Sequence, residues 1–112
     1  LTWTALTAGK FSMRFSPQGF IFDAMGPACF ASDISHSYYI LGYLNSKVGV
    51  SFLRILCPNL KFDQKPLENT PFIDEIIERS SIKECTNQCI NYAKDDWDSY
   101  ETSWDFNRNP LV

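Results

Sequence analysis

The sequence predicts an α+β fold in which a small β-sheet or hairpin packs on a central helix or helix pair, followed by C-terminal helices. Two observations support this prediction. Residues 11–22 contain short alternating segments separated by turn residues, a pattern typical of paired strands. Residues 38–56 carry apolar side chains at steps of three and four, the period of a buried helical face. A length of 112 residues and an apolar content of 45% fit one globular domain with its own core.

The predicted strands lie in the first thirty residues. Phe11–Phe15 alternates apolar and polar side chains, as a half-buried strand does. Ser16–Gly19 has the proline and glycine of a tight turn, and Phe20–Phe22 follows as a second short strand. These segments together predict a hairpin over residues 11–22. Thr2–Leu6 is a further strand candidate.

The central helix is predicted to begin after an N-cap at Asp33 or Ser35 and to end before Pro58. Glycines and the Asn45-Ser46 pair weaken its middle, so either one helix or two is compatible with the sequence. The five residues expected on the buried face are Leu41, Leu44, Val48, Phe52 and Ile55. Lys47, Ser51 and Arg54 share another face, which we expect to meet water or a partner.

The chain is predicted to divide into an α+β domain at residues 1–73 and a helical, acidic and tryptophan-rich segment at residues 74–112. Helix is expected to resume near Asp74, with a break or a second cap at Ser80-Ser81, and a further helix is expected over Ile82–Lys94. The expected buried face of the latter helix consists of Ile82, Cys85, Cys89 and Tyr92.

Several function classes are disfavoured. The four cysteines lack the spacing of a zinc site, so no metal is expected and reduced thiols of a cytoplasmic protein are the default. The central helix contains Asn45, Lys47 and Arg54, which argues against a membrane span. The chain starts without methionine and in mid-pattern, so we expect a piece of a longer protein. The carboxylates at positions 95–105 lack the glycine and closing glutamate of an EF-hand loop and are expected to be solvated.

Charge is distributed unevenly along the chain. The net charge is −3, yet residues 1–65 carry six basic and three acidic side chains, whereas residues 66–112 carry four basic and ten acidic ones. A basic first half and an acidic second half are expected if only the first half faces phosphate.

No motif for catalysis is present. Phosphate-binding glycine loops are absent, and His36 has no evident partner for activating a nucleophile. The residues therefore predict a binding or interaction module with no catalytic residues, no cofactor-binding residues and no metal ligands of its own.

A specific resemblance adds to this prediction. The stretch Asp95–Phe106 reads DDWDSYETSWDF and resembles the D-W-D-S-[FY]-E-T-S-W-D-F signature of PglX proteins, the adenine-specific DNA methyltransferases of BREX phage-defence systems. Leu41–Lys47 resembles the L-G-[FY]-L-N-S-K helix of that family. Gly19–Asp23 and Asn69–Ile73 also resemble family segments, and the similarity runs from about Lys10 to the C-terminus.

The resemblance implies a parent enzyme that transfers a methyl group from S-adenosylmethionine to adenine in double-stranded DNA, for restriction–modification or phage defence. The F-x-G-x-G-type loop and the [DN]-P-P-[YF] sequence that carry this chemistry are missing here. The cofactor is therefore expected in a catalytic domain outside this chain. By resemblance the chain contains part of a target-recognition region, similar in plan to the specificity-subunit domains of type I restriction systems.

Two functions remain open. The first is a non-catalytic DNA target-recognition fragment of an N-6 adenine-specific methyltransferase. The second is a scaffold that joins other domains of the same parent without reading bases. For Asn45 and Ser46 we favour a helix-break or capping role over base reading, and Trp97 and Trp104 are expected to anchor their segment against the sheet or other domains. The candidate DNA-binding residues are Lys10, Arg14, Gln18, Lys47, Arg54 and Lys61.

Overall fold

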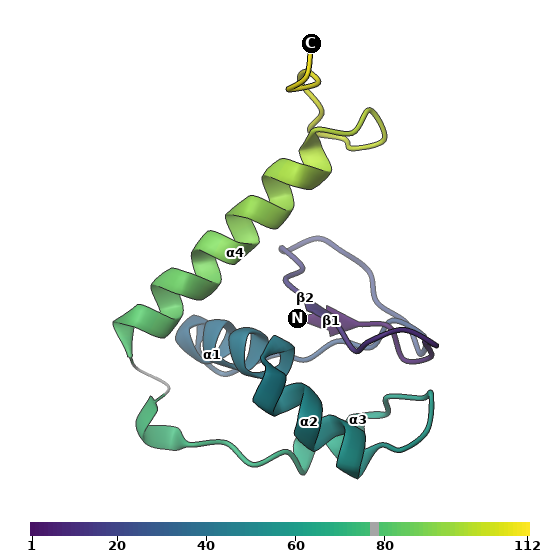
Figure 1. The fold of residues 1–112 in the computed structure, drawn as a ribbon, viewed down its shortest axis with the longest axis vertical. Coiled ribbons are helices and arrows are strands. Elements are labelled where there is room, and N and C mark those ends of the chain that lie inside the picture. The colour runs from purple at the N-terminus through teal and green to yellow at the C-terminus, as the bar shows by residue number, and fades with distance from the viewer. Residues whose placement is uncertain (77–78) are drawn as a thin grey trace.

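The computed structural model describes residues 1–76 and 79–112 and confirms the α+β prediction (Figure 1). Two short antiparallel strands precede a set of helices, of which the last is the longest. In chain order the elements are β1 (Thr2–Trp3), β2 (Met13–Arg14), α1 (Ile34–Asn45), α2 (Lys47–Leu56), α3 (Gln64–Glu68), the 3-10 helix η1 (Asp74–Ile76) and α4 (Ser80–Asp98).

The N-terminal segment forms the centre of a small irregular sheet. On one edge, β1 pairs with β2 in the register Thr2 to Arg14 and Trp3 to Met13. On the other edge, backbone N–H groups of Trp3 and Ala5 donate to carbonyls of residues 27 and 25, at 3.3 and 2.9 Å. Further along that edge, Ala5 accepts from the N–H of residue 62 at 2.6 Å. The strand predicted over residues 2–6 is thus present in shortened form.

The predicted hairpin over residues 11–22 is wrong. The turn exists at Gln18-Gly19, but Phe20–Phe22 is not a strand and its three side chains are exposed. The reason is that both edges of β2 are already occupied. β1 takes one edge, and the Asn45 side-chain amide takes the peptide groups of Met13 on the other.

The central helical region consists of two helices that meet at Ser46. Asp33 is the N-cap of α1, and its carboxylate accepts the backbone N–H of Ser35 at 2.6 Å. Ser46 has an extended backbone and caps α2 by accepting the N–H of Gly49 at 3.1 Å. A Cβ atom at Gly49 would collide with the carbonyl oxygen of Tyr43, so the sharp connection requires glycine there. The two-helix alternative is the one the structure adopts.

This break changes which side chains are buried. Leu41 and Leu44 of α1 are buried as predicted. In α2 the buried positions are Gly49 and Leu53, whereas the predicted Val48, Phe52 and Ile55 are exposed. The prediction was wrong for α2 because Ser46 leaves the helical path, so that the periodicity of α1 does not continue into the next helix.

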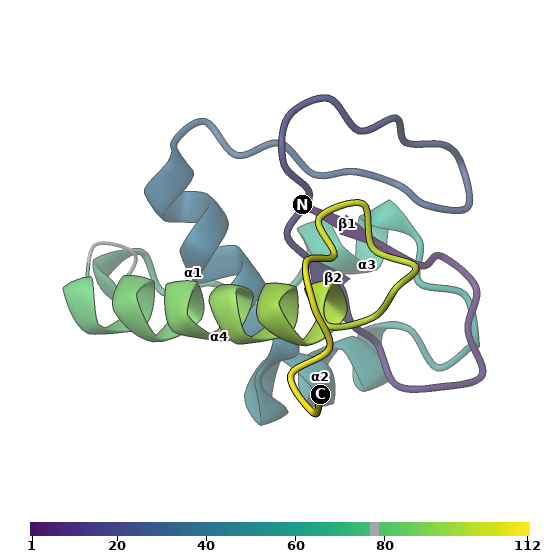
Figure 2. The same ribbon diagram turned by 90° about the horizontal axis from the view of Figure 1, so that it is seen from above.

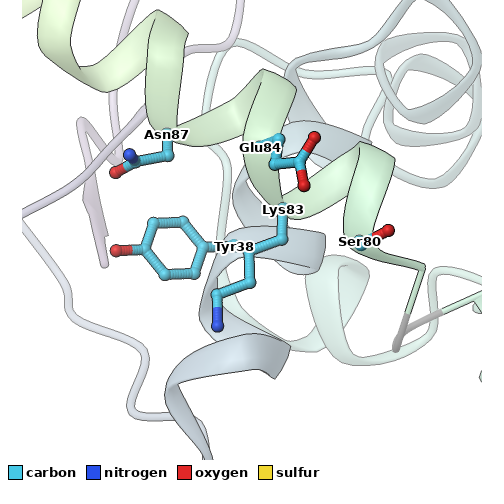
Figure 3. A pocket seen from close by; sticks show the side chains of 5 residues that line it. All are labelled: Tyr38, Ser80, Lys83, Glu84 and Asn87. Carbon is cyan, nitrogen blue, oxygen red and sulfur yellow. The ribbon is translucent and has the colours of Figure 1, made fainter.

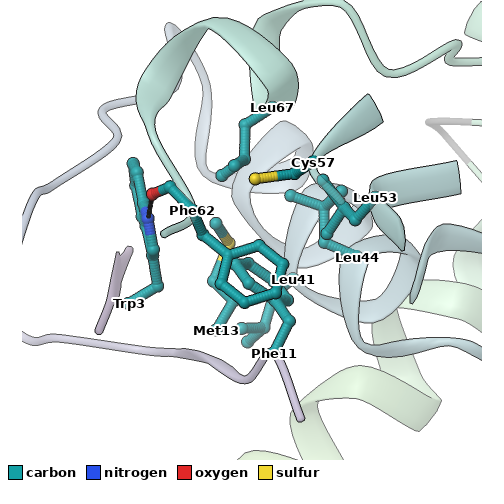
Figure 4. Close-up of a cluster of buried hydrophobic side chains, with 9 residues drawn as sticks. All are labelled: Trp3, Phe11, Met13, Leu41, Leu44, Leu53, Cys57, Phe62 and Leu67. Carbon is teal, nitrogen blue, oxygen red and sulfur yellow. Dashed lines mark hydrogen bonds between the residues drawn. The ribbon is translucent and has the colours of Figure 1, made fainter. Parts of the chain in front are cut away.

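The core lies between the sheet and the α1–α2 pair, and Figure 4 shows side chains from both converging on it. Trp3, Leu44 and Leu53 are the most deeply buried large side chains. The indole N–H of Trp3 donates to the carbonyl oxygen of Phe62 at 2.9 Å, so this large ring is buried without an unpaired polar group. The remaining core members are Phe11, Met13, Leu41, Cys57, Phe62 and Leu67.

Helix α4 packs on α1 and then extends beyond it (Figures 1 and 2). Its contact face consists of Ile82, Thr86 and Ile90, and only Thr86 is fully buried. Of the predicted face, Ile82 is half-buried, but the prediction was wrong for Cys85, Cys89 and Tyr92, which are exposed. A Cβ atom on Gly42 would lie 2.6 Å from the Thr86 hydroxyl oxygen, so the glycine allows this close approach. Of the helix expected near Asp74, residues 74–76 form η1, and residues 77–78 lie outside the described residues.

Candidate nucleic-acid interface

The Asn45-Ser46-Lys47 connection fixes how the helices stand against the sheet. The Asn45 amide oxygen accepts the backbone N–H of Met13 at 3.0 Å, and its amide nitrogen donates to the Met13 carbonyl at 2.9 Å. The same nitrogen donates to the carbonyl of Leu41 at 2.9 Å. The side chain thus imitates the peptide group of a neighbouring strand. Together with the Ser46 cap, these bonds confirm the predicted structural role of the pair.

A basic face lies on α2, directly after this connection. Lys47, Ser51 and Arg54 are all exposed, and their spacing of four and three residues puts them on one side of the helix. The Ser51 hydroxyl donates to the Lys47 carbonyl at 2.7 Å. Within the described part of the chain, neither Lys47 nor Arg54 forms an ion pair. Both cations are therefore available to an anionic partner.

The remaining candidate cations come from other segments. Arg14 of β2 is exposed and donates to the Thr4 hydroxyl at 2.9 Å. Since Asn45 holds the preceding residue of β2, Arg14 and Lys47 come from segments that are hydrogen-bonded together. Lys61 pairs with Asp63 at 3.0 Å, which offsets its charge locally. Lys10 lies exposed in the connection between β1 and β2.

Gln18 lies beside an apolar groove. It is exposed in the turn before Gly19, whose φ of 101° falls in the left-handed region. The groove has a volume of about 520 Å³ and is bounded by the turn and by residues 28–31. Phe22 and Phe30 meet edge-on there, with ring centres 5.4 Å apart. Gln18 is thus accompanied by exposed apolar side chains and not by cations.

A second hollow of about 370 Å³ lies between α1 and the start of α4, and Figure 3 shows its lining side chains. Lys83 of α4 lies over the ring of Tyr38, with its Nζ atom 5.9 Å from the ring centre. Glu84, the next residue of α4, brings an opposite charge to the same hollow. This mixed surface offers no arrangement of nucleophile and base.

Sequence reasoning missed a polar cluster at the end of α4. Lys94 Nζ lies 2.5 Å from Asp98 and 3.1 Å from Asp105, and the Ser103 hydroxyl donates to Asp98 at 2.6 Å. The hydrogen bond from Lys94 and then that from Ser103 lower the pKa of Asp98, while the two carboxylates raise the pKa of Lys94. The four-residue spacing of Lys94 and Asp98 was the available signal.

The two tryptophans of the acidic segment do not pack on the sheet. Trp97 is 58% exposed and Trp104 is 102% exposed. The prediction that they anchor their segment against the sheet is therefore wrong. The alternative, an anchor against other domains, stays a prediction.

Comparison with known proteins shows that similar sequences occur in adenine-specific methyltransferases. The adenine-specific methyltransferase PglX of Lacticaseibacillus casei (strain Zhang) is 37% identical over 112 residues, which is 100% of this chain. The adenine-specific methyltransferase BrxX of Escherichia coli O9:H4 (strain HS) is 34% identical over 113 residues, which is 99% of this chain. The chain spans 9% of the length of each of these proteins and is a fragment of a protein of this kind, which confirms the resemblance seen in the sequence.

No family model and no solved structure matches the chain. The predicted similarity in plan to the specificity domains of type I restriction systems therefore stays a prediction. Across residues 1–76 and 79–112, no helix combines the length and the apolar character needed to cross a membrane. The same described residues contain no group of three or more His, Cys, Asp or Glu side chains placed to hold a metal ion.

The glycines of the described residues are not arranged as a glycine-rich cofactor loop, and the expectation that S-adenosylmethionine binds in another domain stays a prediction. A cofactor loop needs clustered glycines that let the backbone approach the ligand. Here Gly42 and Gly49 lie inside helices, where they serve helix packing and the α1–α2 connection. Gly9, Gly19 and Gly26 are separated along the chain.

Proposed function

We propose that the chain is a non-catalytic DNA target-recognition segment of a bacterial N-6 adenine-specific DNA methyltransferase that acts in restriction–modification or BREX phage defence. The proposal extends the similarity to PglX and BrxX, whose names describe adenine-specific methyltransferases. S-adenosylmethionine and the reacting base belong in this proposal to another domain of the cytoplasmic parent protein. Residues 1–73 meet the DNA, and residues 74–112 join them to other domains.

A recognition segment is needed because of the chemistry of the target. Adenine N6 is paired inside the duplex, so the enzyme must swing the base out before it can react. The grip on the flanking duplex must therefore come from surfaces outside the catalytic pocket. Cations set affinity and register on the phosphates, and amide or hydroxyl side chains read base edges.

The exposed basic face of α2 is the observation that favours this function. Lys47 and Arg54 lie on one side of α2. This helix begins two residues after Asn45, the last residue of α1, whose amide binds Met13 of β2, and Arg14 is the next residue of that strand. Lys10 and Lys61 are additional phosphate candidates, and Gln18 is the candidate for a base edge. Residues 1–65, which include α2, carry six basic and three acidic side chains, and this excess of positive charge favours an anionic partner.

The test is binding of the chain to duplex DNA across a salt series. Affinity should fall steeply as salt rises, because each neutralised phosphate releases bound counterions. Lys47→Gln and Arg54→Gln should each reduce the slope of log affinity against log salt by roughly 0.9. Lys83→Gln and Arg108→Gln remove the same charge from the acidic half and should leave the slope unchanged.

Two results would redirect the proposal. Equal loss of slope in all four variants would mean that only net charge matters and that α2 has no special role. A folded chain that does not bind DNA at low salt would favour the scaffold function, in which the segment joins domains of the methyltransferase without contacting bases.

A further inference from the structure

The end of α4 and the turn that follows it carry exposed aromatic side chains on an ordered frame. We call residues 97–105 the aromatic turn. Three of its rings are exposed: Trp97 at 58%, Tyr100 at 57% and Trp104 at 102%. Among the aromatic pairs of the described residues, none includes these three rings. Rings of this size and exposure are typical of interfaces and not of a free surface.

The backbone of the aromatic turn is held by its own polar groups. The N–H groups of Tyr100 and Ser103 donate to the carbonyls of Trp97 and Tyr100, at 3.1 and 3.0 Å. Lys94 joins the last helical turn to Asp105, and Ser103 is buried at the centre with its hydroxyl on Asp98. The rings are therefore presented by a pre-ordered loop, which lowers the entropy cost of binding.

The negative charge of residues 95–105 indicates which kind of partner the aromatic turn fits. The residues from 95 to 105 carry five carboxylates, and Lys94 contacts two of them, Asp98 and Asp105. Asp95, Asp96 and Glu101 have no cation partner among the described ion pairs. Such a surface repels phosphate, so it does not fit DNA. It fits a basic protein surface with apolar pockets for the rings.

We propose that the aromatic turn docks on a basic surface of another domain of the same methyltransferase polypeptide. The turn stands at one end of the longest axis of the molecule (Figure 1), beyond the helix pair that carries the basic face. Docking there fixes the direction of α4, and through its contact with α1 it fixes the position of α1 and α2 relative to the rest of the enzyme. The inference rests on the part of the proposed function that places this chain in a larger methyltransferase.

The test is carbodiimide cross-linking of the full-length methyltransferase without DNA, because this reagent joins a carboxylate directly to a contacting lysine amine. Mass spectrometry should find Asp95, Asp96 or Glu101 joined to lysines of the same polypeptide outside residues 1–112. A mixture of ¹⁵N-labelled and unlabelled protein separates links within one molecule from links between molecules. Because DNA is absent, the outcome is independent of whether the basic face of α2 binds duplex.

The variant Trp97→Ala/Trp104→Ala should lower the yield of these cross-links about tenfold, as loss of central interface tryptophans does. Phe20→Ala removes an aromatic side chain that is 70% exposed elsewhere and should leave the yield unchanged. Cross-links only between labelled and unlabelled molecules, or the same yield in the double variant, would overturn the proposal. Absence of any link from these three carboxylates would also overturn it.

Discussion

Residues 1–73 and residues 80–112 are each stabilised internally by a different kind of interaction. In residues 1–73, Trp3, Leu44 and Leu53 are 2%, 2% and 0% exposed, and they join the sheet to α1 and α2 through apolar contact. In residues 80–112, the buried side chains are Thr86 and Ser103, and hydrogen bonds and ion pairs of short sequence separation shape the turn. Residues 1–73 therefore enclose most of the apolar interior, whereas the end of α4 and the turn after it expose their aromatic side chains.

The largest expected effect comes from breaking the first half at its centre. Leu53→Ala should destabilise the chain by about 2–5 kcal/mol, because it removes buried contacts and leaves a cavity beneath α2. The matched control is Ile55→Ala in the same helix, at a side chain that is 76% exposed, which should change stability by no more than about 0.5 kcal/mol. Urea denaturation of both variants measures the difference. A larger loss for Ile55→Ala would mean that a single helix runs through Ser46.

The joint between the halves is the crossing of α1 and α4. Gly42→Ala brings a methyl group to 2.6 Å from the Thr86 hydroxyl oxygen, so it should destabilise the chain by about 1–3 kcal/mol, reduced by the roughly 1 kcal/mol that alanine gains over glycine in a helix. In a Thr86→Ala background the clash is gone, and the same substitution should become stabilising. A double-mutant cycle by chemical denaturation measures this change of sign. If the effect of Gly42→Ala is the same in both backgrounds, the helices do not meet at these two residues.

Local patterns in the sequence predicted where helices and strands lie better than they predicted which elements pack together. Asp33 and Pro58 set limits to the α1–α2 region because capping and the missing proline N–H act within a few residues. The family relationship followed from the continuous stretch Asp95–Phe106 and is supported over the whole chain. Both results depend on residues that are close in sequence.

Contacts between residues that are distant in the sequence could not be predicted from the sequence. Phe20–Phe22 has strand composition, yet it stays unpaired because Asn45, more than twenty residues later, occupies the free edge of β2. Likewise Val48 and Ile55 have the correct spacing for burial, but the turn at Ser46 directs Leu53 inward instead.

The smallest expected effect is the pH dependence of the stability of the aromatic turn. Because the folded-state pKa of Asp98 is lowered, its bonds to Lys94 and Ser103 contribute stability above its ordinary value of 3.8, and this is lost as pH falls through the lowered pKa. The raised pKa of Lys94 has the opposite sign. Its contribution is present below 10.5 and is lost as pH rises through the raised value. The bonds of Asp98 to Lys94 and Ser103 should therefore persist at all pH values near neutrality.

Carbon-13 NMR titration of the Asp98 carboxyl measures this directly. Lys94→Met should raise the Asp98 pKa towards 3.8 more than Ser103→Ala does, since the lysine hydrogen bond is the larger cause of the shift. Neither variant should change the unfolding of residues 1–73, because an exposed ion pair contributes little to global stability. If unfolding of the core instead followed the Asp98 titration, the turn would be part of the same cooperative unit.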